Sequence, residues 1–155
     1  MVNKAQQYVH GYHERESERL QAQAGSVLDL LHADTAYPAG SLILEVGCGT
    51  GALCAAILDT GSPSSVTGVE PSPGFLESAR RQLAGRATLL RGSATAIPLD
   101  DACVDVVASG LVLNFVADQP AALAEMTRVT DRGGVIAAYV WDYAGKMEIM
   151  RVFWD

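Results

Sequence analysis

Three glycines in the segment at residues 45–52, EVGCGTGA, have the spacing of loops that bind nucleotide cofactors. Glycine permits positive φ angles and lets a ligand approach the backbone where a strand turns into a helix. The spacing fits a G-x-G-x-x-G/A loop for a pyrophosphate and also a tighter G-x-G-x-G loop for a different nucleoside cofactor. It would equally fit a tight turn that binds nothing. The glycines alone therefore leave the ligand open.

Two acidic residues narrow the choice. Glu70 ends the second apolar run, where a carboxylate accepts hydrogen bonds from the ribose hydroxyls of either NAD or an adenosyl ligand. Glu45 precedes the loop, and its charge would repel a pyrophosphate, which a helix N-terminus otherwise attracts. The cationic sulfonium and amino groups of S-adenosylmethionine would be favoured there, directly or through a water molecule. Alternatively, Glu45 caps backbone groups or pairs with a basic residue.

Short apolar runs alternate with helical segments in the part of the chain that must position these residues. The expected strands are residues 42–46, 65–70, 87–91, 104–109 and 135–141. The expected helices are residues 52–58, residues 75–83 after Ser72 as N-cap and Pro73, and a helix that begins near Asp118 and Pro120. Residues 131–134 are expected to form a turn.

Runs that are apolar on both faces and alternate with helices indicate a buried parallel sheet. The predicted fold class is therefore α/β, a Rossmann-like doubly wound parallel sheet with right-handed crossovers. The last helix is expected to bury Leu123, Met126 and Val129 on one face. Ligands of such sheets bind at the carboxyl ends of the strands, where the first glycine loop would lie.

The composition excludes several classes of function. The chain has 155 residues, 49% of them hydrophobic, and a net charge of -7, which is typical of one soluble domain and unfavourable for binding nucleic acid. No apolar run is long enough for a membrane span, and residues 1–19 lack the apolar core of a signal peptide. Cys48, Cys54 and Cys103 have no metal-site spacing, so we expect reduced thiols, no metal and a cytoplasmic location.

Four motifs in order together resemble the class I S-adenosylmethionine-dependent methyltransferases, in particular the group that acts on small molecules and quinone-like compounds. The motifs are LEVGCGTG at residues 44–51, VEPS at 69–72, GSA at 92–94 with IPLDD at 97–101, and VDVV at 104–107. The resemblance runs from about Tyr8 to Tyr143. It implies the class I methyltransferase fold, S-adenosyl-L-methionine as cofactor and S-adenosyl-L-homocysteine as product.

The resemblance also assigns roles to individual residues. The residues that would line the methionine end of the cofactor are Glu45, Gly47, Cys48, Gly49 and Gly51 in the first loop, with Gly110 and Leu111 after the fourth strand. Glu70 would hold the ribose, Pro71 would flank the adenine, and Gly92, Ser93 and Ala94 would border it. Ser93 stands where the family commonly has Asp, so its shorter neutral hydroxyl would replace a carboxylate acceptor. Asn114, where relatives often have His, would approach the substrate or close a turn before Asp118.

The N-terminal segment corresponds to a lid in the family. Within a helical lid at residues 1–35, Tyr12, Arg15 and Arg19 fall on one helical face. We expect Tyr12 and Arg19 to close on the methionine carboxylate, and His13 to lie near the substrate. A solvated helix face is the alternative interpretation.

The whole chain is expected to be one S-adenosylmethionine-binding domain, with a Rossmann-like core at residues 41–141 and the start of a truncated C-terminal part at 142–155. Relatives usually continue into an antiparallel hairpin, so we expect that pair of strands to be lacking and the incomplete sheet edge to favour self-association. The expected activity is methyl transfer to a small-molecule acceptor, with no catalytic residue identified. The alternatives are a cofactor-binding fragment or inactive relative without catalysis and, less consistent with Glu45, an NAD-dependent oxidoreductase.

Overall fold

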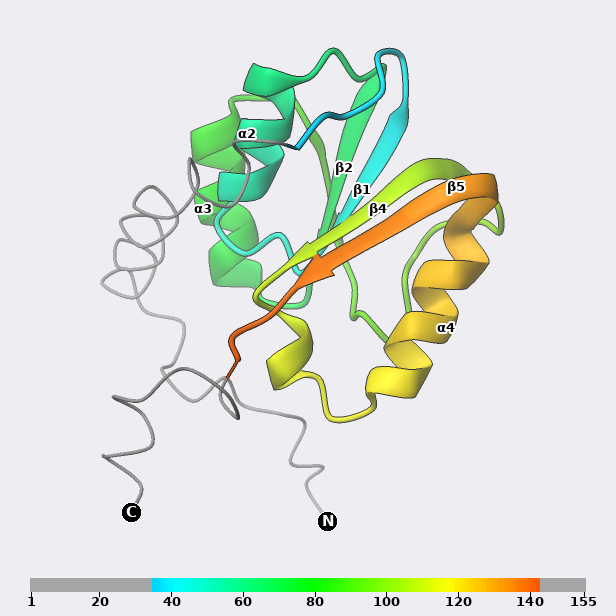
Figure 1. Ribbon diagram of the computed structural model, residues 1–155. Helices are drawn as coiled ribbons and strands as arrows, with labels where there is room; N and C mark the ends of the chain where they lie inside the picture. The colour runs from blue at the N-terminus through cyan, green and yellow to red at the C-terminus, as the bar shows by residue number, and fades with distance from the viewer. Residues whose placement is uncertain (1–34, 143–155) are drawn as a thin grey trace.

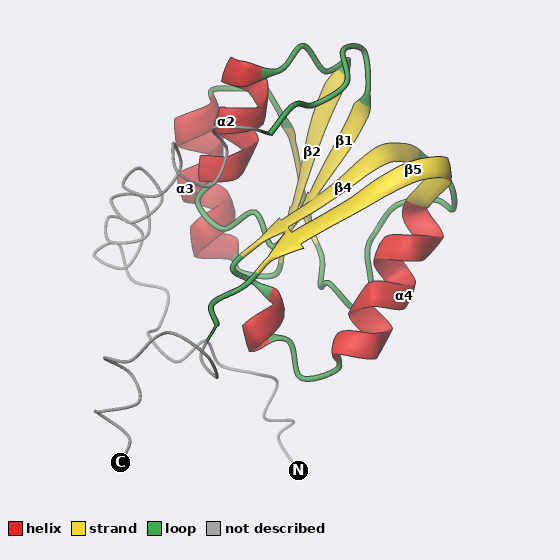
Figure 2. Cartoon of the chain, in the orientation of Figure 1, coloured by secondary structure: helices red, strands yellow, loops and turns green. Residues whose placement is uncertain are grey.

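Five parallel strands form one sheet in the order β3-β2-β1-β4-β5 (Figures 1 and 2). The computed structural model describes residues 35–142. The strands are β1 (Leu42–Val46), β2 (Ser65–Glu70), β3 (Thr88–Arg91), β4 (Val104–Gly110) and β5 (Thr130–Tyr139). The helices are α2 (Ala52–Thr60), α3 (Pro73–Leu83), α4 (Gln119–Val129) and the short 3-10 helix η1 (Leu113–Phe115).

Helices cover both faces of this sheet, as Figure 1 shows: α2 and α3 lie on one face and α4 on the other. The central strand β1 supplies both cores, because its alternate side chains point to opposite faces. Ile43 packs with α2 and α3 in one apolar cluster, while Leu44 and Val46 pack with α4 in the other. All three are almost fully buried. The predicted doubly wound α/β fold is confirmed.

The strand order places a switch point between β1 and β4. The chain moves from β1 to β2 and β3 in one direction, then returns to β4 on the other side of β1. The last residue of β1, Val46, pairs with Val69 near the end of β2, and Glu45 pairs with Ala108 in β4. The loops that follow β1, β2 and β4 therefore leave the sheet at the same edge, as expected for a ligand site.

The fifth strand differs from the prediction. The sequence predicts a turn at residues 131–134 and a strand at 135–141, but β5 begins at Thr130 and ends at Tyr139. Thr130 pairs with Val104, and Val135 then pairs with Val106, so extra residues of β5 form a bulge. Gly133 has φ 83°, and a Cβ on Gly134 would lie 2.7 Å from the carbonyl oxygen of Asp105. The glycines thus interrupt the ladder without ending the strand.

Helix α4 corrects a second expectation. Met126 and Val129 are fully buried as predicted, but Leu123 is 47% exposed and Ala122 takes its place in the core. Positions 122, 126 and 129 follow the spacing of four and three residues that keeps side chains on one helical face. Leu123 is rotated out of that stripe by about 100°. None of the helices between residues 35 and 142 is long and apolar enough to cross a lipid bilayer.

Two side-chain caps begin the helices where the sequence indicated. The Ser72 hydroxyl accepts a hydrogen bond from the Phe75 amide at 3.3 Å, as predicted for the start of α3. The Asp118 carboxylate accepts from the Ala121 amide at 3.0 Å at the start of α4. Each cap satisfies an amide that has no partner inside its helix.

We expect Asp118→Ala to lower the free energy of unfolding by about 1 kcal/mol, because the Ala121 amide loses its acceptor. Asp118→Asn retains an acceptor oxygen and serves as the control, with a change of only a few tenths of a kcal/mol. Urea unfolding followed by circular dichroism measures both values. Equal losses in the two variants would contradict a capping role.

Candidate functional site

The glycine loop between β1 and α2 is tied to the end of β2. Gly47, Gly49 and Gly51 have φ angles of 76°, 52° and 87°, in the left-handed region that favours glycine. The amides of Gly47 and Cys48 both donate to the carbonyl oxygen of Val69, at 2.8 and 3.1 Å. The Gly51 amide donates to the Cys48 carbonyl oxygen at 2.7 Å. The loop therefore satisfies these backbone groups internally.

The surroundings of the three glycines differ. A Cβ on Gly47 would lie 2.5 Å from Cγ2 of Val112, in the segment after β4, and a Cβ on Gly51 would lie 2.9 Å from Cδ1 of Leu83 in α3. At Gly49 no heavy atom of the described residues, apart from its chain neighbours, lies within 4 Å of the Cβ position. Gly47 and Gly51 thus allow close packing, while Gly49 borders open space.

Glu70 joins β2, the glycine loop and α3. The residue is buried, with 6% of its surface exposed. Oε2 accepts from the Gly49 amide at 3.1 Å and Oε1 accepts from the Ser72 amide at 2.9 Å. Burial raises the pKa of Glu70, and the two amide donors oppose this shift. Because each carboxylate oxygen has two lone pairs, both can accept a second donor such as a hydroxyl.

Glu45 is buried without a full set of partners. The residue is 3% exposed, and within residues 35–142 its Oε2 has no hydrogen-bond partner. Burial raises the pKa of Glu45 to about 8, while the thiol and amide of Cys54 act in the opposite direction and the charge of Glu70 adds to the rise. No basic side chain among residues 35–142 contributes to this shift. The Cys54 amide thus supplies one of the structural partners considered from the sequence, a backbone group for Glu45 to cap, whereas the described residues supply no cation and leave Oε2 without a partner.

Two tyrosines that sequence reasoning missed lie near Glu45. Burial, the Glu45 charge and Tyr37 raise the pKa of Tyr139 to about 12, and burial and Glu45 also raise the pKa of Tyr37. A Cβ on Gly110 would overlap the ring of Tyr139, so glycine is needed there for close packing. In the sequence, the only indication of a role for Tyr139 is its position in the expected fifth strand. The acidic group therefore lies among polar aromatic side chains.

The segment after β4 packs over the glycine loop. Leu111 has φ 60°, a strained value for a residue with a branched side chain, and its amide donates to the Tyr139 carbonyl oxygen at 2.8 Å. Asn114 in η1 donates from Nδ2 to the Trp141 carbonyl oxygen at 3.1 Å and accepts from the Trp141 amide at Oδ1 at 3.0 Å. The side-chain amide of Asn114 thus bonds the two segments together, and Asp118 caps α4.

Gly92, Ser93 and Ala94 follow β3 at the same edge. The Gly92 amide donates to the Glu70 carbonyl oxygen at 3.3 Å, which links this segment to the carboxylate that contacts the glycine loop. The Ser93 hydroxyl accepts from the Thr95 amide at 3.2 Å and lies 3.0 Å from the Thr95 hydroxyl oxygen. Pro71, next to Glu70, is exposed. The structure thus brings the described candidate residues together on the four loops that follow β1, β2, β3 and β4.

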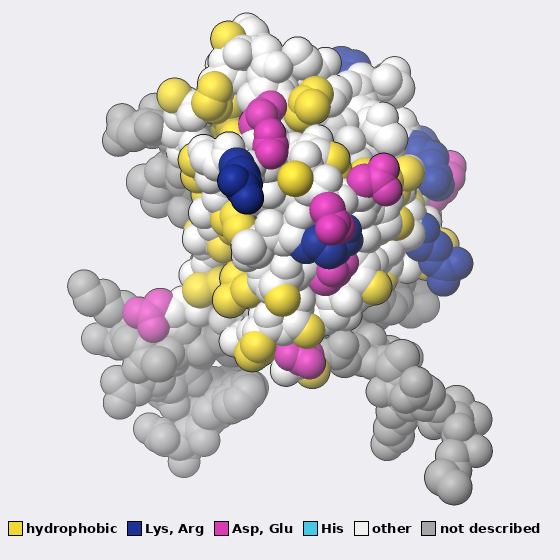
Figure 3. Space-filling model, turned by 90° about the vertical axis from the view of Figure 1, so that its right-hand side faces the viewer, with side chains coloured by type: hydrophobic (Ala, Val, Ile, Leu, Met, Phe, Trp, Pro, Cys, Tyr) yellow, Lys and Arg dark blue, Asp and Glu magenta, His cyan; other side chains and the backbone are white. Residues whose placement is uncertain are grey.

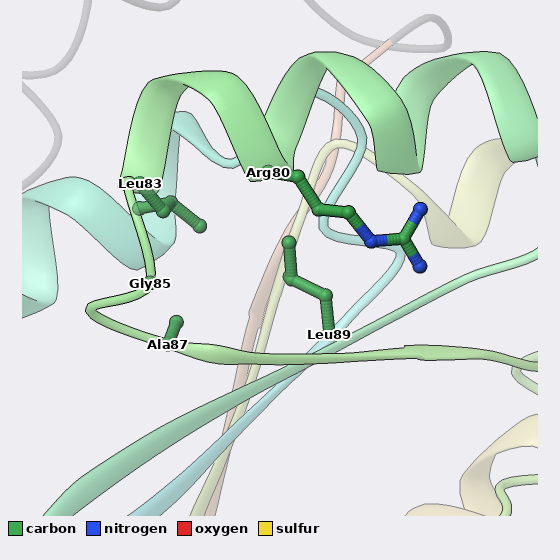
Figure 4. Close-up of a pocket in the computed structure, with 5 residues that line it drawn as sticks. All are labelled: Arg80, Leu83, Gly85, Ala87 and Leu89. Atoms are coloured by element: carbon green, nitrogen blue, oxygen red, sulfur yellow. The ribbon is translucent and has the colours of Figure 1, made fainter.

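The other candidate residues are not part of the described structure, and the hollow in the described residues lies away from the predicted site. Tyr12, His13 and Arg19, with the proposed lid and the C-terminal part, lie outside the described residues. A hollow of about 320 Å³ lies between α3 and β3, lined by Arg80, Leu83, Gly85, Ala87 and Leu89 (Figure 4). None of these five is a predicted site residue. In residues 35–142 no group of three or more His, Cys, Asp or Glu side chains could hold a metal ion.

Comparison with known proteins identifies the family. Residues 44–138, more than half of the chain, match the family described as Methyltransferase domain. The chain belongs to this methyltransferase family. The matched region of the methyltransferase domain extends from β1 to β5 and includes every described candidate residue. The resemblance inferred from the four motifs is confirmed.

A curated relative and two solved structures support this assignment. The domain is 41% identical over 107 residues to malonyl-[acyl-carrier protein] O-methyltransferase from Serratia marcescens, across 69% of this chain and 40% of the relative. An S-adenosylmethionine-dependent methyltransferase from Thermotoga maritima superposes with a TM-score of 0.69 and 28% identity, covering 90% of this chain and 62% of that one.

The complex of the Haloferax volcanii Trm112 methyltransferase activator with a methyltransferase gives a TM-score of 0.75 at 23% identity, over 82% of this chain and 57% of that one. This likeness shows the fold, and the class I methyltransferase fold is thereby confirmed. The chain spans less than half the length of the curated relatives that it matches first.

The raised pKa of Glu45 predicts a pH dependence of stability. The folded domain holds this proton more tightly than the unfolded chain, whose carboxyl has the ordinary value of 4.5. The contribution is complete below the unfolded pKa and is lost as the pH rises toward about 8. We expect the free energy of unfolding to fall as the pH rises across this window. Glu45→Gln should make this pH dependence less steep. Part of the dependence should remain, because the pKa of Glu70 is also raised.

Urea unfolding at a series of pH values measures this slope. Glu77→Gln is the control, because Glu77 is an exposed carboxylate with 59% of its side chain accessible. It should leave the slope unchanged. A slope in Glu45→Gln equal to that of the unaltered domain would contradict the assignment.

The contact between Gly47 and Val112 gives another prediction. Gly47→Ala introduces both a strained positive φ and a clash with Val112, so we expect a loss of about 2 kcal/mol in the free energy of unfolding. The double variant Gly47→Ala/Val112→Ala removes the clash and should recover part of the loss relative to Val112→Ala alone. Strict additivity of the two changes in urea unfolding would show that the residues do not interact.

Proposed function

We propose that this methyltransferase domain binds S-adenosyl-L-methionine at the carboxyl edge of β1, β2 and β4 and transfers its methyl group to a small-molecule acceptor. The observation that carries the proposal is the buried, half-partnered carboxyl group of Glu45 beneath the glycine loop. An orphaned buried acceptor is costly unless a donor completes it. The cationic amino group of the methionine part supplies such a donor, directly or through a water molecule.

The hydrogen bonds of the loop argue against a pyrophosphate. A dinucleotide loop presents its amides to the phosphates. Here the amides of Gly47, Cys48 and Gly49 are already bonded to Val69 and Glu70, and the Gly51 amide is bonded within the loop. The buried carboxylate of Glu70, next to the loop, would repel a phosphate further. An NAD-dependent oxidoreductase is therefore disfavoured.

The remaining described residues fit the other parts of the cofactor. Glu70 has acceptor capacity left for two ribose hydroxyls, which donate to it. Pro71 would lie against one face of the adenine, and Gly92, Ser93 and Ala94 would border its edge. Because the Ser93 hydroxyl is engaged with Thr95, the Ala94 amide is the more available group for the adenine. Gly110 and Leu111 would face the methionine end beside the glycine loop.

When bound, S-adenosylmethionine supplies a methyl group already activated by the sulfonium. The contribution of the chain is to bind, orient and exclude water around the reactants. Asn114 is proposed to shape the acceptor side through its two bonds to Trp141, and His13, Tyr12 and Arg19 are proposed to complete the site from the N-terminal lid. No catalytic base is assigned among the described residues, and the proposed acceptor presents a nucleophilic atom that is deprotonated or loses its proton to solvent.

The broader setting is proposed from the same observations. On the face of the molecule that carries α4, basic side chains lie beside acidic ones (Figure 3), and the net charge is -7, which disfavours nucleic acid as the acceptor. The three cysteines are free thiols, consistent with a reducing cytoplasmic location. Val135 and Ile136 of the edge strand β5 are 56% and 38% exposed, which supports self-association through this strand.

Calorimetry with S-adenosylhomocysteine and NAD tests the cofactor. We expect the first to bind and the second not to bind. Because Glu45 is largely protonated at pH 7 in the free domain, a cationic amino group beside it should release up to one proton on binding, seen as a dependence of the binding enthalpy on the buffer. Glu45→Gln should weaken binding severalfold and abolish the release. Undiminished binding by Glu45→Gln would remove the argument.

A cofactor-binding unit without catalysis is the second candidate, because the chain spans less than half the length of the curated relatives that it matches first. Incubation with methyl-labelled S-adenosylmethionine and a metabolite extract separates the two. Labelled small molecules support catalysis, whereas binding without transfer supports the second candidate.

A further inference from the structure

A guanidinium group outside the predicted site makes the densest set of polar contacts in the described residues. Arg128, near the end of α4, donates from Nε and Nη2 to the two carboxylate oxygens of Glu125 at 2.6 and 2.8 Å. Nη1 donates to the carbonyl oxygen of Leu99 and to Oδ1 of Asp101, both at 2.8 Å. Nη2 also donates to the carbonyl oxygen of Ile97 at 2.9 Å.

These contacts enclose one tight turn. The Leu99 amide donates to the Ile97 carbonyl oxygen at 2.9 Å, which closes a three-residue turn around Pro98. Arg128 binds the carbonyl oxygens on both sides of Pro98, and Oε2 of Glu125 accepts from the Ile97 amide at 2.8 Å. These donors hold the pKa of Glu125 at about 2, so the carboxylate stays charged at neutral pH. Two side chains of α4 thus fix the turn at three backbone atoms.

The turn packs against the segment that is proposed to border the adenine. A Cβ on Gly92 would lie 2.6 Å from Cδ of Pro98, so the proline ring packs directly against Gly92. On the other side, the Gly92 amide is bonded to the carbonyl oxygen of Glu70. Ala94 and Leu99 pack against the core cluster that contains Ile97. Gly92 is therefore held between the end of β2 and a turn whose position depends on Arg128.

The hydrogen bonds of Arg128 connect α4 to the backbone of the turn as well as to charged side chains. The Asp101 side chain is 78% exposed, and an ion pair of this kind contributes little to stability. The bonds to two carbonyl oxygens and the bidentate contact with Glu125 use the planar fork of arginine, which a lysine cannot reproduce. That geometry suits a group that fixes the relative position of two segments.

We propose that Arg128, oriented by Glu125, is a positioning residue for the adenine subsite, because it seats Pro98 against Gly92 and thereby sets the position of residues 92–94. The inference rests on the proposed binding of S-adenosylmethionine. Arg128 does not contact the adenine; it acts through the turn and the proline ring.

Calorimetry on the full chain tests the proposal with S-adenosylhomocysteine as the probe. Arg128→Ala should weaken binding about tenfold, because several bonds to a charged donor are lost. Arg128→Lys should lie between that variant and the unaltered chain. Asp101→Ala is the matched control, since it removes only the exposed partner of Arg128, and should bind within about twofold of the unaltered chain.

A double-variant cycle separates positioning from general stability. Pro98→Ala removes the ring that transmits the contact to Gly92, so adding Arg128→Ala to it should change the affinity little further. The preference for S-adenosylhomocysteine over S-inosylhomocysteine, which carries an oxygen in place of the adenine amino group, should fall severalfold in Arg128→Ala. If Arg128→Ala does not fold, Arg128→Lys and Pro98→Ala give the same comparison.

Amide hydrogen exchange supplies a readout without ligand. Arg128→Ala should lose protection at the Leu99 and Gly92 amides, whereas Asp101→Ala should keep it. Affinity within twofold in Arg128→Ala, an unchanged preference between the two ligands, or full additivity in the cycle would each overturn the proposal. Failure of the unaltered chain to bind S-adenosylhomocysteine would instead count against the proposed function, and the exchange result would still report on the turn.

Discussion

The hydrogen bonds between the glycine loop and the end of β2 are the constraint on which the site depends. Val69 accepts from two loop amides and Glu70 from a third, so the loop is held to the sheet before any ligand arrives. The left-handed glycines make this path of the backbone accessible, and the same bonds leave fewer amides to meet a phosphate. One set of contacts thus shapes the loop and restricts its ligand.

The buried carboxyl groups give this loop its electrostatic character. Glu70 is satisfied by amides from both neighbouring segments, while Glu45 retains an oxygen without a partner among the described residues. Burial favours the protonated form of Glu45, and a bound cation would favour the charged form. The buried carboxyl group of Glu45 is therefore locally unfavourable, and a positively charged ligand group would stabilise it. Such perturbed groups are common at functional sites.

On the face of the sheet that carries α4, hydrogen bonds and packing contacts hold the backbone segments around the site. Arg128 and Glu125 connect α4 to the turn around Pro98, and that turn contacts Gly92. Asn114 similarly joins η1 to the segment after β5. The helices and loops around the site thus serve as supports for backbone segments whose own side chains are small.

The sequence by itself determined the fold class, the first two strands and the family, because apolar periodicity, glycine spacing and helix caps are local properties. It did not reveal the bulge in β5, the exposure of Leu123 or the position of Tyr139 near Glu45. The sequence also could not show that the amides of the loop donate hydrogen bonds to Val69 and Glu70. Nor could it show that Arg128 donates hydrogen bonds to a turn about thirty residues earlier in the chain. These features depend on strand register and on contacts between distant segments, which only the tertiary structure decides. The packing of β1 between β2 and β4, for example, fixes which loops meet at one edge of the sheet.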